Sequence, residues 1–171
     1  MIRNKQRWTM AGMSILVTVA LSACQQAQVA DSYSERAKTY VVKANMKKVQ
    51  AAAEAYFKDH TYMYPTKIDD DFKSYFDGGD PAAKKPGKGP NNPFTGNEEW
   101  PVLGGLTDPV AARQEVPMEL GKGVIEYSAV DGGKNYAIRG GAENRKSITG
   151  ENESNMGSYV ISRDSVDKPS Q

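Results

Sequence analysis

The stretch of sequence that decides the fold is residues 42–56, VKANMKKVQAAAEAY, which has the composition and spacing of an amphipathic helix. Neither Gly nor Pro occurs between residue 31 and Lys58. Apolar residues recur at spacings of four, three, four and three, and the set is Val42, Met46, Val49, Ala53 and Tyr56. Because this spacing places them on one helical face, we expect a long helix that starts at an N-cap at Asp31 or Ser32 and buries that face.

The chain after this helix predicts a short second helix. Pro65 lacks a backbone N–H and disfavours helix in the residue before it, so the first helix must end ahead of it. Asp69, Asp70 and Asp71 then suit the N-terminus of a helix, where carboxylates interact favourably with the helix dipole. Adjacent side chains on a helix point in different directions, so we expect these carboxylates to be solvated and not to converge on a cation.

Residues 77–121 predict a long irregular loop. Of these 45 residues, 15 are Gly or Pro, which interrupt regular structure repeatedly. The order of glycines, Lys and Ser or Thr that makes a phosphate-binding loop is missing. We expect the Lys84–Lys88 stretch to be exposed. The apolar residues expected to tether the loop to the core are Phe94, Trp100, Val102 and Leu103.

The last third of the chain predicts an antiparallel sheet. Apolar and polar residues alternate over residues 125–129 and again over 136–138, on either side of the turn Asp131-Gly132-Gly133, so these two runs form a hairpin. Residues 146–149 and 158–163 are weaker strand candidates. The predicted fold class is therefore α+β, with a long N-terminal helix packed on a small antiparallel sheet and the Gly/Pro-rich loop between them.

The N-terminus has the layout of a secretory signal peptide. A basic start is followed by an apolar run over residues 10–21 and then by Leu21-Ser22-Ala23-Cys24, and the basic residues are Arg3, Lys5 and Arg7. A membrane-spanning helix needs about 20 apolar residues, whereas Gln25 and Gln26 follow Cys24 at once, so a retained span is the less favoured alternative. The expected organisation is a signal peptide at 1–23, a short tether at 24–30, a globular domain at 31–163 and a polar tail at 164–171.

The Leu-Ser-Ala-Cys tetrad resembles the lipobox of bacterial lipoproteins, whose cysteine is acylated and becomes the first residue of the mature chain. The resemblance implies lipid attachment at Cys24, which is the only cysteine of the chain. It also implies a location on the cell membrane or outer membrane, facing the periplasm or the exterior. Gln25 stands where an Asp would follow the cysteine, and this resembles the sorting pattern of outer-membrane lipoproteins.

Charge and composition argue against several classes of function. Residues 1–23 hold three of the 22 Lys and Arg residues and none of the 21 Asp and Glu residues, so the remaining 148 residues carry a net charge of −2. This balance gives no electrostatic basis for binding nucleic acid. His60 is the only histidine, so nucleophilic triads and histidine-based zinc sites lack their residues. We expect no catalysis, no metal and no cofactor, while a paired-carboxylate hydrolase stays an open alternative.

Four further motifs carry a family resemblance, and they are residues 42–56 followed by Tyr64-Pro65-Thr66, Asn92-Pro93-Phe94, Gly123-Val124-Ile125-Glu126-Tyr127 and Tyr136-Ala137-Ile138. In this order they resemble the type IV pilin-like proteins, especially the G-type major pseudopilin of type II secretion. The resemblance covers about residues 35–140. It implies a pilin-like domain and a part in protein transport.

The chain departs from that family at its start. A pilin precursor is cut after a Gly, ahead of a long apolar helix with Glu at its fifth position. Cleavage after Gly12 would put Val17 at that position, and the apolar run ends at Cys24. Pseudopilins also bind calcium in a loop between late strands, but the corresponding residues 140–147 offer only Glu143 and Asn144, whereas calcium takes six to eight oxygens.

The function expected from these features is that of a membrane-anchored bacterial lipoprotein with a pseudopilin-like head, a non-enzymatic binding or structural component of the cell envelope. Its partners would be the membrane, through lipid on Cys24, and envelope or secretion-machinery proteins. Trp100 and Phe94 are the candidate partner-binding residues, because aromatic residues on loops are enriched at interfaces; either ring can instead pin the loop to the core. The alternatives are a true pseudopilin subunit of a filament, or a surface module that binds ions or glycans through residues 77–121.

Overall fold

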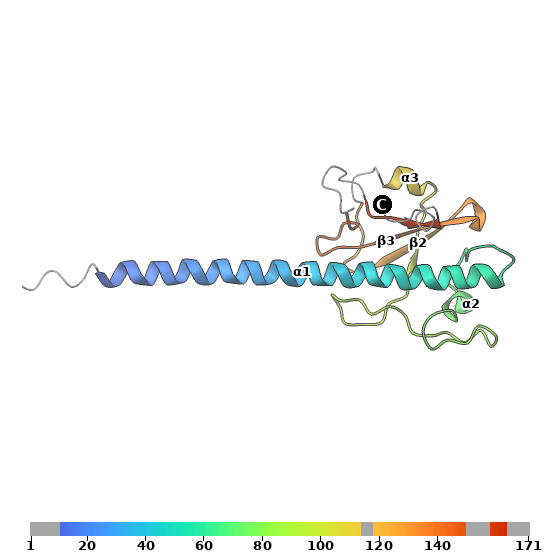
Figure 1. Cartoon of the computed structure of the whole chain (residues 1–171), viewed down its shortest axis with the longest axis horizontal. Coiled ribbons are helices and arrows are strands. Elements are labelled where there is room, and N and C mark those ends of the chain that lie inside the picture. Colours follow the sequence, from blue (N-terminus) through green and yellow to red (C-terminus); the bar gives the residue numbers. More distant parts are fainter. Residues whose placement is uncertain (1–10, 114–117, 150–157, 164–171) are drawn as a thin grey trace, which may run out of the picture. The chain divides into compact units, whose positions relative to one another are not determined.

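The computed structural model describes residues 11–113, 118–149 and 158–163, with side chains described from Ser34 onward. It shows a mixed α+β fold with one long helix and a four-stranded mixed sheet (Figure 1). The chain divides into two compact units, Met1–Ala37 and Lys38–Gln171. In the first unit the described residues are all helical. The second unit is called the head.

The long helix α1 spans Ala11–Asp59. Its start differs from the N-cap expected at Asp31 or Ser32, and the residues expected as a tether, 24–30, are helical. The physical reason is that no Gly or Pro follows Gly12 until the helix has ended, so nothing in the sequence breaks it. Within the described residues, no helix is both long enough and apolar enough to cross a membrane.

The buried face of α1 is the predicted one. Val42, Met46, Val49 and Ala53 are fully buried, and Tyr56 is half-buried at the end of the stripe. Gly140 faces this stripe, and a Cβ built on it would lie 2.7 Å from Val42 Cγ1 and 2.8 Å from Met46 Sδ. A glycine at this position therefore allows the helix and the sheet to approach closely.

The sheet has the strand order β1-β2-β3-β4. Its strands are β1 (Val102–Leu103), β2 (Ile125–Val130), β3 (Asn135–Gly140) and β4 (Ile161–Ser162). The expected hairpin is confirmed, since β2 and β3 pair antiparallel around the short helical turn η1 (Asp131–Gly133), and β4 pairs antiparallel with β3. Of the weaker strand candidates, 158–163 supplies β4, whereas 146–149 makes only isolated bridges.

The expectation of a wholly antiparallel sheet is wrong, because β1 pairs with β2 in parallel. Residues 104–124 separate the two strands, which is enough chain for the crossover that parallel pairing needs. The crossover carries the short helix α3 (Pro109–Ala112), whose Ala112 packs with Val130, Ala137 and Val160 on the sheet face away from α1. Val102 and Leu103 are 46% and 55% exposed, so their backbone, and not a buried side chain, ties this part of the loop to the sheet.

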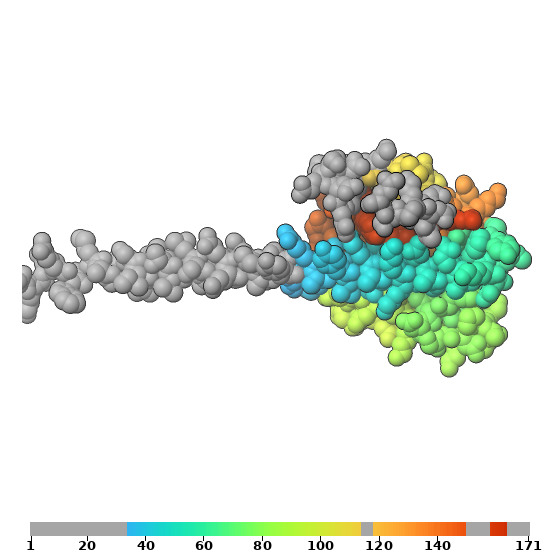
Figure 2. All heavy atoms as spheres, viewed as in Figure 1, coloured from blue at the N-terminus to red at the C-terminus, as the bar shows by residue number. Residues whose placement is uncertain are grey.

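The other side of α1 carries α2 and the loop that follows it (Figure 1). The helix α2 spans Asp70–Lys73, and the side chain of Asp69 caps it by accepting a hydrogen bond from the Phe72 amide. Phe72 and Phe76 are buried in the same apolar cluster as the sheet residue Tyr127. Figure 2 shows the head part of α1 running between this loop, drawn in green, and the sheet side, drawn in orange and red.

Candidate functional site

The predicted lipid attachment residue, Cys24, falls within the backbone range of α1, and its side chain lies outside the described part of the structure. The first ten residues of the predicted signal peptide and the predicted polar tail at 164–171 also lie outside the described residues. These predictions therefore rest on the sequence.

The two candidate partner-binding rings, Phe94 and Trp100, both pack against the apolar core and are half-buried. Trp100 meets Phe76 edge to face, with 5.2 Å between ring centroids. Each ring also has an ammonium group over it: Lys73 Nζ lies 5.5 Å from the Trp100 centroid, and Lys38 Nζ lies 5.3 Å from the Phe94 centroid. Both rings thus tether the loop, as expected, and each leaves part of its surface exposed.

A buried asparagine holds the loop in one conformation, and sequence reasoning did not find it. Asn92 is 2% exposed, and its Nδ2 donates to Glu99 Oε2 (2.8 Å) and to the Lys122 carbonyl (2.9 Å). Its Oδ1 accepts from the Phe94 amide at 2.9 Å. Gly123 has φ of +70°, and a Cβ there would lie 2.0 Å from Asn92 Oδ1, so a glycine is required beside this side chain. The only signal in the sequence is the turn-forming run at 91–96.

A groove of about 490 Å³ lies between α1 and this loop. It is within the usual size range of small-ligand sites, roughly 300–1,000 Å³. Helix α1 contributes Lys48 and Ala51, and the loop contributes charged side chains of both signs, Asp77, Lys88 and Glu98. Among the described residues, none of these four charged side chains makes a hydrogen bond or an ion pair. The groove therefore offers free charges that balance one another, and it suits a polar ligand of little net charge.

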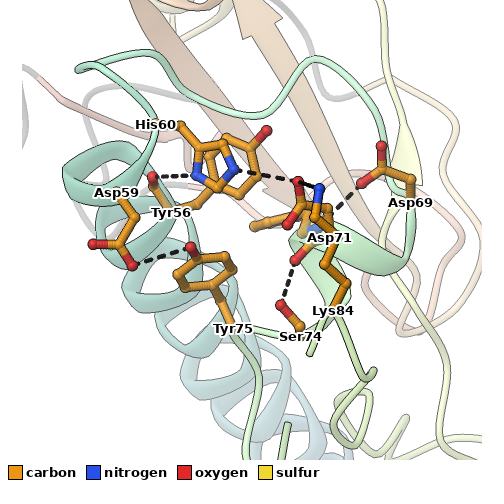
Figure 3. A network of polar contacts seen from close by, with 9 residues as sticks. Tyr56, Asp59, His60, Asp69, Asp71, Ser74, Tyr75 and Lys84 are labelled. Atoms are coloured by element: carbon orange, nitrogen blue, oxygen red, sulfur yellow. Dashed lines mark hydrogen bonds and ion pairs between the residues drawn. The ribbon is translucent and has the colours of Figure 1, made fainter. Parts of the chain in front are cut away.

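A polar cluster joins the end of α1 to α2 (Figure 3). His60 stacks on Tyr56 with 3.6 Å between ring centroids, and its Nδ1 lies 3.0 Å from the Tyr56 carbonyl oxygen. Its Nε2 lies 3.2 Å from Asp71 Oδ2, which also accepts from Lys84 Nζ at 3.0 Å. The expected solvated carboxylates are confirmed for Asp69 and Asp70 but not for Asp71, whose side chain is 18% exposed because it lies between His60 and Lys84.

The electrostatics of the cluster follow from these contacts. The hydrogen bond from Lys84 is the main reason that the pKa of Asp71 lies below its usual range; the hydrogen bond from His60 adds to this, and partial burial opposes it. Tyr75 donates from its hydroxyl to Asp59 Oδ2 at 3.0 Å. Burial first, and this carboxylate second, raise the pKa of Tyr75 to about 12. The Tyr75 hydroxyl therefore stays protonated near neutral pH.

A serine hydroxyl also belongs to the cluster. Ser74 is the nearby hydroxyl, and its Oγ donates to the Asp71 carbonyl at 2.6 Å, so it is engaged with backbone. The described residues hold no group of three or more His, Cys, Asp and Glu that could bind a metal. In the loop of residues 140–147, which would correspond to the calcium loop of pseudopilins, Glu143 pairs with Lys122 Nζ at 2.6 Å. Asn144 Oδ1 in the same loop accepts a hydrogen bond from the Lys146 amide.

Comparison of the chain with models of protein families, with curated proteins and with solved structures finds no match. The pilin-like resemblance of residues 35–140 stays a prediction from the sequence. The fold itself supports the coarser description, a long helix beside a mixed sheet.

Proposed function

We propose that this chain is a bacterial lipoprotein whose α+β head acts as a non-enzymatic binding or structural component of the cell envelope. The observation that carries the proposal is the position of Cys24 directly after a basic start and a short apolar run. Burial of each lipid CH₂ group contributes about 0.8 kcal/mol, so two acyl chains on one residue anchor a protein stably where one chain binds only weakly. The anchor would hold the head on the cell membrane or outer membrane, facing the periplasm or exterior.

We propose further that the head recognises an envelope or secretion-machinery protein through the groove between α1 and the loop. Two features support this: the four unpaired charges at the walls of the groove, and a loop that Asn92 holds in place. A fixed loop loses little conformational freedom when a partner binds. Phe94 and Trp100 stay candidate contacts through the exposed parts of their rings.

The second candidate function is that of a pseudopilin subunit of a type II secretion or type IV pilus-like filament. One observation favours it: α1 is assigned as a single helix from Ala11 onward, and filament subunits of this kind have a long N-terminal helix. Against it stand the position of Val17 after a cut at Gly12 and the glutamines that follow Cys24.

Intact-mass analysis of the protein purified from membranes separates the two functions. The lipoprotein predicts a chain that begins at Cys24 and carries the added mass of acyl groups. The pseudopilin predicts an unlipidated chain that begins at Met13. The variant Cys24→Ser lacks the sulfur that forms the thioether, so we expect it to lose the lipid and to leave the membrane or accumulate as precursor. A Cys24→Ser protein that is processed and membrane-bound like the parent would exclude the lipoprotein.

The groove is tested with a matched pair of variants on one helix. Lys48 lines the groove, whereas its neighbour Lys47 is exposed away from it. We expect Lys48→Glu to weaken cross-linking to envelope partners, because it changes the balance of charge in the groove, while Lys47→Glu leaves the cross-linked products unchanged. Equal effects of the two substitutions would show that partners do not bind in the groove.

A further inference from the structure

The surroundings of His60 place a hydrogen-bond acceptor at each of its two ring nitrogens (Figure 3). Nδ1 faces the Tyr56 carbonyl oxygen at 3.0 Å, and Nε2 faces the Asp71 carboxylate at 3.2 Å. Neither a carbonyl nor an ionised carboxylate can donate. A neutral imidazole has one N–H donor and one lone pair, whereas the doubly protonated ring donates from both nitrogens. Only the protonated ring can therefore make both hydrogen bonds at once.

Each neutral tautomer leaves one contact unfavourable. With the proton on Nδ1, the lone pair of Nε2 faces the Asp71 carboxylate. With the proton on Nε2, the lone pair of Nδ1 faces the Tyr56 carbonyl. The stack on the Tyr56 ring, parallel within 4° at a centroid distance of 3.6 Å, holds the plane of the imidazole in place.

The charged groups around the ring come from every element packed against it. Helix α1 supplies Tyr56 and Asp59. Asp59 accepts a hydrogen bond from the Tyr75 hydroxyl. The start of α2 supplies Asp69 and Asp71, and the loop supplies Lys84, whose ammonium bonds to the same Asp71 oxygen as the ring (Figure 3). The Asp71 carboxylate therefore favours a positively charged ring, while the Lys84 ammonium on the same oxygen opposes it.

We propose that His60 is a pH-dependent clamp, in which the doubly protonated ring ties the end of α1 to Asp71 and loses one of its two ties when it is deprotonated. Histidine ordinarily changes its charge between about pH 5 and pH 8. Asp71 also holds Lys84 of the loop, and Tyr75 to Asp77, which come shortly after α2, line the groove. The clamp therefore fixes one wall of the groove more firmly at acid pH than at alkaline pH. It does not depend on the lipid anchor.

The protonation of the ring is tested directly by NMR of the full chain in detergent, labelled with ¹⁵N in the imidazole. We expect both ring nitrogens of His60 to carry a proton at about pH 5.5, and a single neutral tautomer at about pH 8.5 with changed amide signals in residues 71–84. Finding one neutral tautomer at about pH 5.5 would overturn the proposal. Titration of the ring without any change in the Asp71 and Lys84 signals would overturn it too.

The consequence for the loop is tested by hydrogen exchange of residues 71–88, comparing the parent with His60→Gln at each pH. Glutamine retains a donor but does not titrate. We expect exchange to be about threefold to tenfold faster in His60→Gln near pH 5.5, as for the loss of one ordinary intramolecular hydrogen bond, with most of this difference gone near pH 8.5.

Lys84→Met serves as the control, because it removes the other donor to Asp71 and lysine does not titrate in this range. Hydrogen exchange of residues 71–88 in Lys84→Met should be faster than in the parent by a similar factor at both pH values. A His60→Gln difference that is equally independent of pH would show that His60 is a fixed structural contact and not a clamp.

Discussion

The β2–β3 hairpin and the loop of residues 77–99 both pack against α1, but different forces hold them. The hairpin presents buried apolar side chains to the helix, and Tyr127, Tyr136 and Ile138 are fully buried there. The loop is mostly exposed, and single polar contacts hold it, such as the bond of 2.7 Å from Asn45 Nδ2 to the Asn91 carbonyl. The difference teaches that the hairpin depends mainly on area removed from water, whereas the loop, apart from the packing of Phe94, depends on individual donors and acceptors.

Even on the hairpin side, one polar group is built into the apolar contact. Glu54 of α1 accepts hydrogen bonds from the hydroxyls of Tyr64 and Tyr136, and Gln50 donates to the Tyr136 hydroxyl at 3.0 Å. These bonds fix the register between the helix and β3, which apolar packing alone specifies less strictly.

The largest effect is expected where the hairpin meets α1. Met46 is fully buried against Gly140, so Met46→Ala should lower the free energy of unfolding by about 2–5 kcal/mol, the range for a buried large-to-small substitution. Lys47→Ala, on the exposed face, should change it by no more than about 0.5 kcal/mol. Urea unfolding of the full chain in detergent measures both. Equal effects would mean that the buried face of α1 is assigned wrongly.

An intermediate effect is expected from the asparagine that fixes the loop. Asn92→Ala leaves the Lys122 carbonyl and the Phe94 amide without their partner, and a buried group left unsatisfied costs about 1–3 kcal/mol. Hydrogen exchange should rise in residues 90–99 and stay unchanged in β2 and β3. The control is Asn97→Ala, at an exposed position of the same turn. Faster exchange of the hairpin in Asn92→Ala would remove the distinction between the two regions.

The smallest effect is expected from the ion pairs of Asp71. Its pKa is lowered in the folded chain, so the stability it contributes is present above the ordinary aspartate value of about 3.9 and is lost as pH falls through the lower folded value. The loss should be no more than about 1 kcal/mol, as for a partly exposed ion pair. Thermal unfolding between about pH 5 and pH 2 measures it, and Asp71→Asn should remove this part of the pH dependence. Asp70→Asn, at an exposed position, should retain it.

Local patterns in the sequence correctly predicted the elements that depend on neighbouring residues. The helical face from Val42 to Tyr56 and the alternation around Asp131-Gly132-Gly133 are local signals, and the structure confirms both. The predicted start of α1 at Asp31 or Ser32 was wrong, because a good N-cap residue starts a helix only where the preceding chain is not itself helical. No composition rule marks Asp31 as interior to a helix that begins at Ala11.

The features that were missed all depend on residues far apart in the sequence. The strand β1 has two residues and no alternation that could be read, and its direction is fixed by its pairing with residues 126 and 127. Asn92 becomes a buried hub only because Lys122 and Gly123 close over it. Asp71 looked like one of three equal carboxylates until the chain brought His60 and Lys84 to it.

The parallel pairing of β1 with β2 also bears on the order in which the head folds. Strands β2 and β3 are joined by a short turn, so their pairing closes a small loop and can form within microseconds. Pairing of Val102 with Glu126 must close a much longer loop, which costs more conformational entropy. The two residues of β1 are exposed, so their pairing offsets little of that cost. The hairpin on α1 is therefore the natural nucleus, and β1, with the crossover behind it, docks late. We therefore expect the β1 edge of the sheet to form after the hairpin and to open before it.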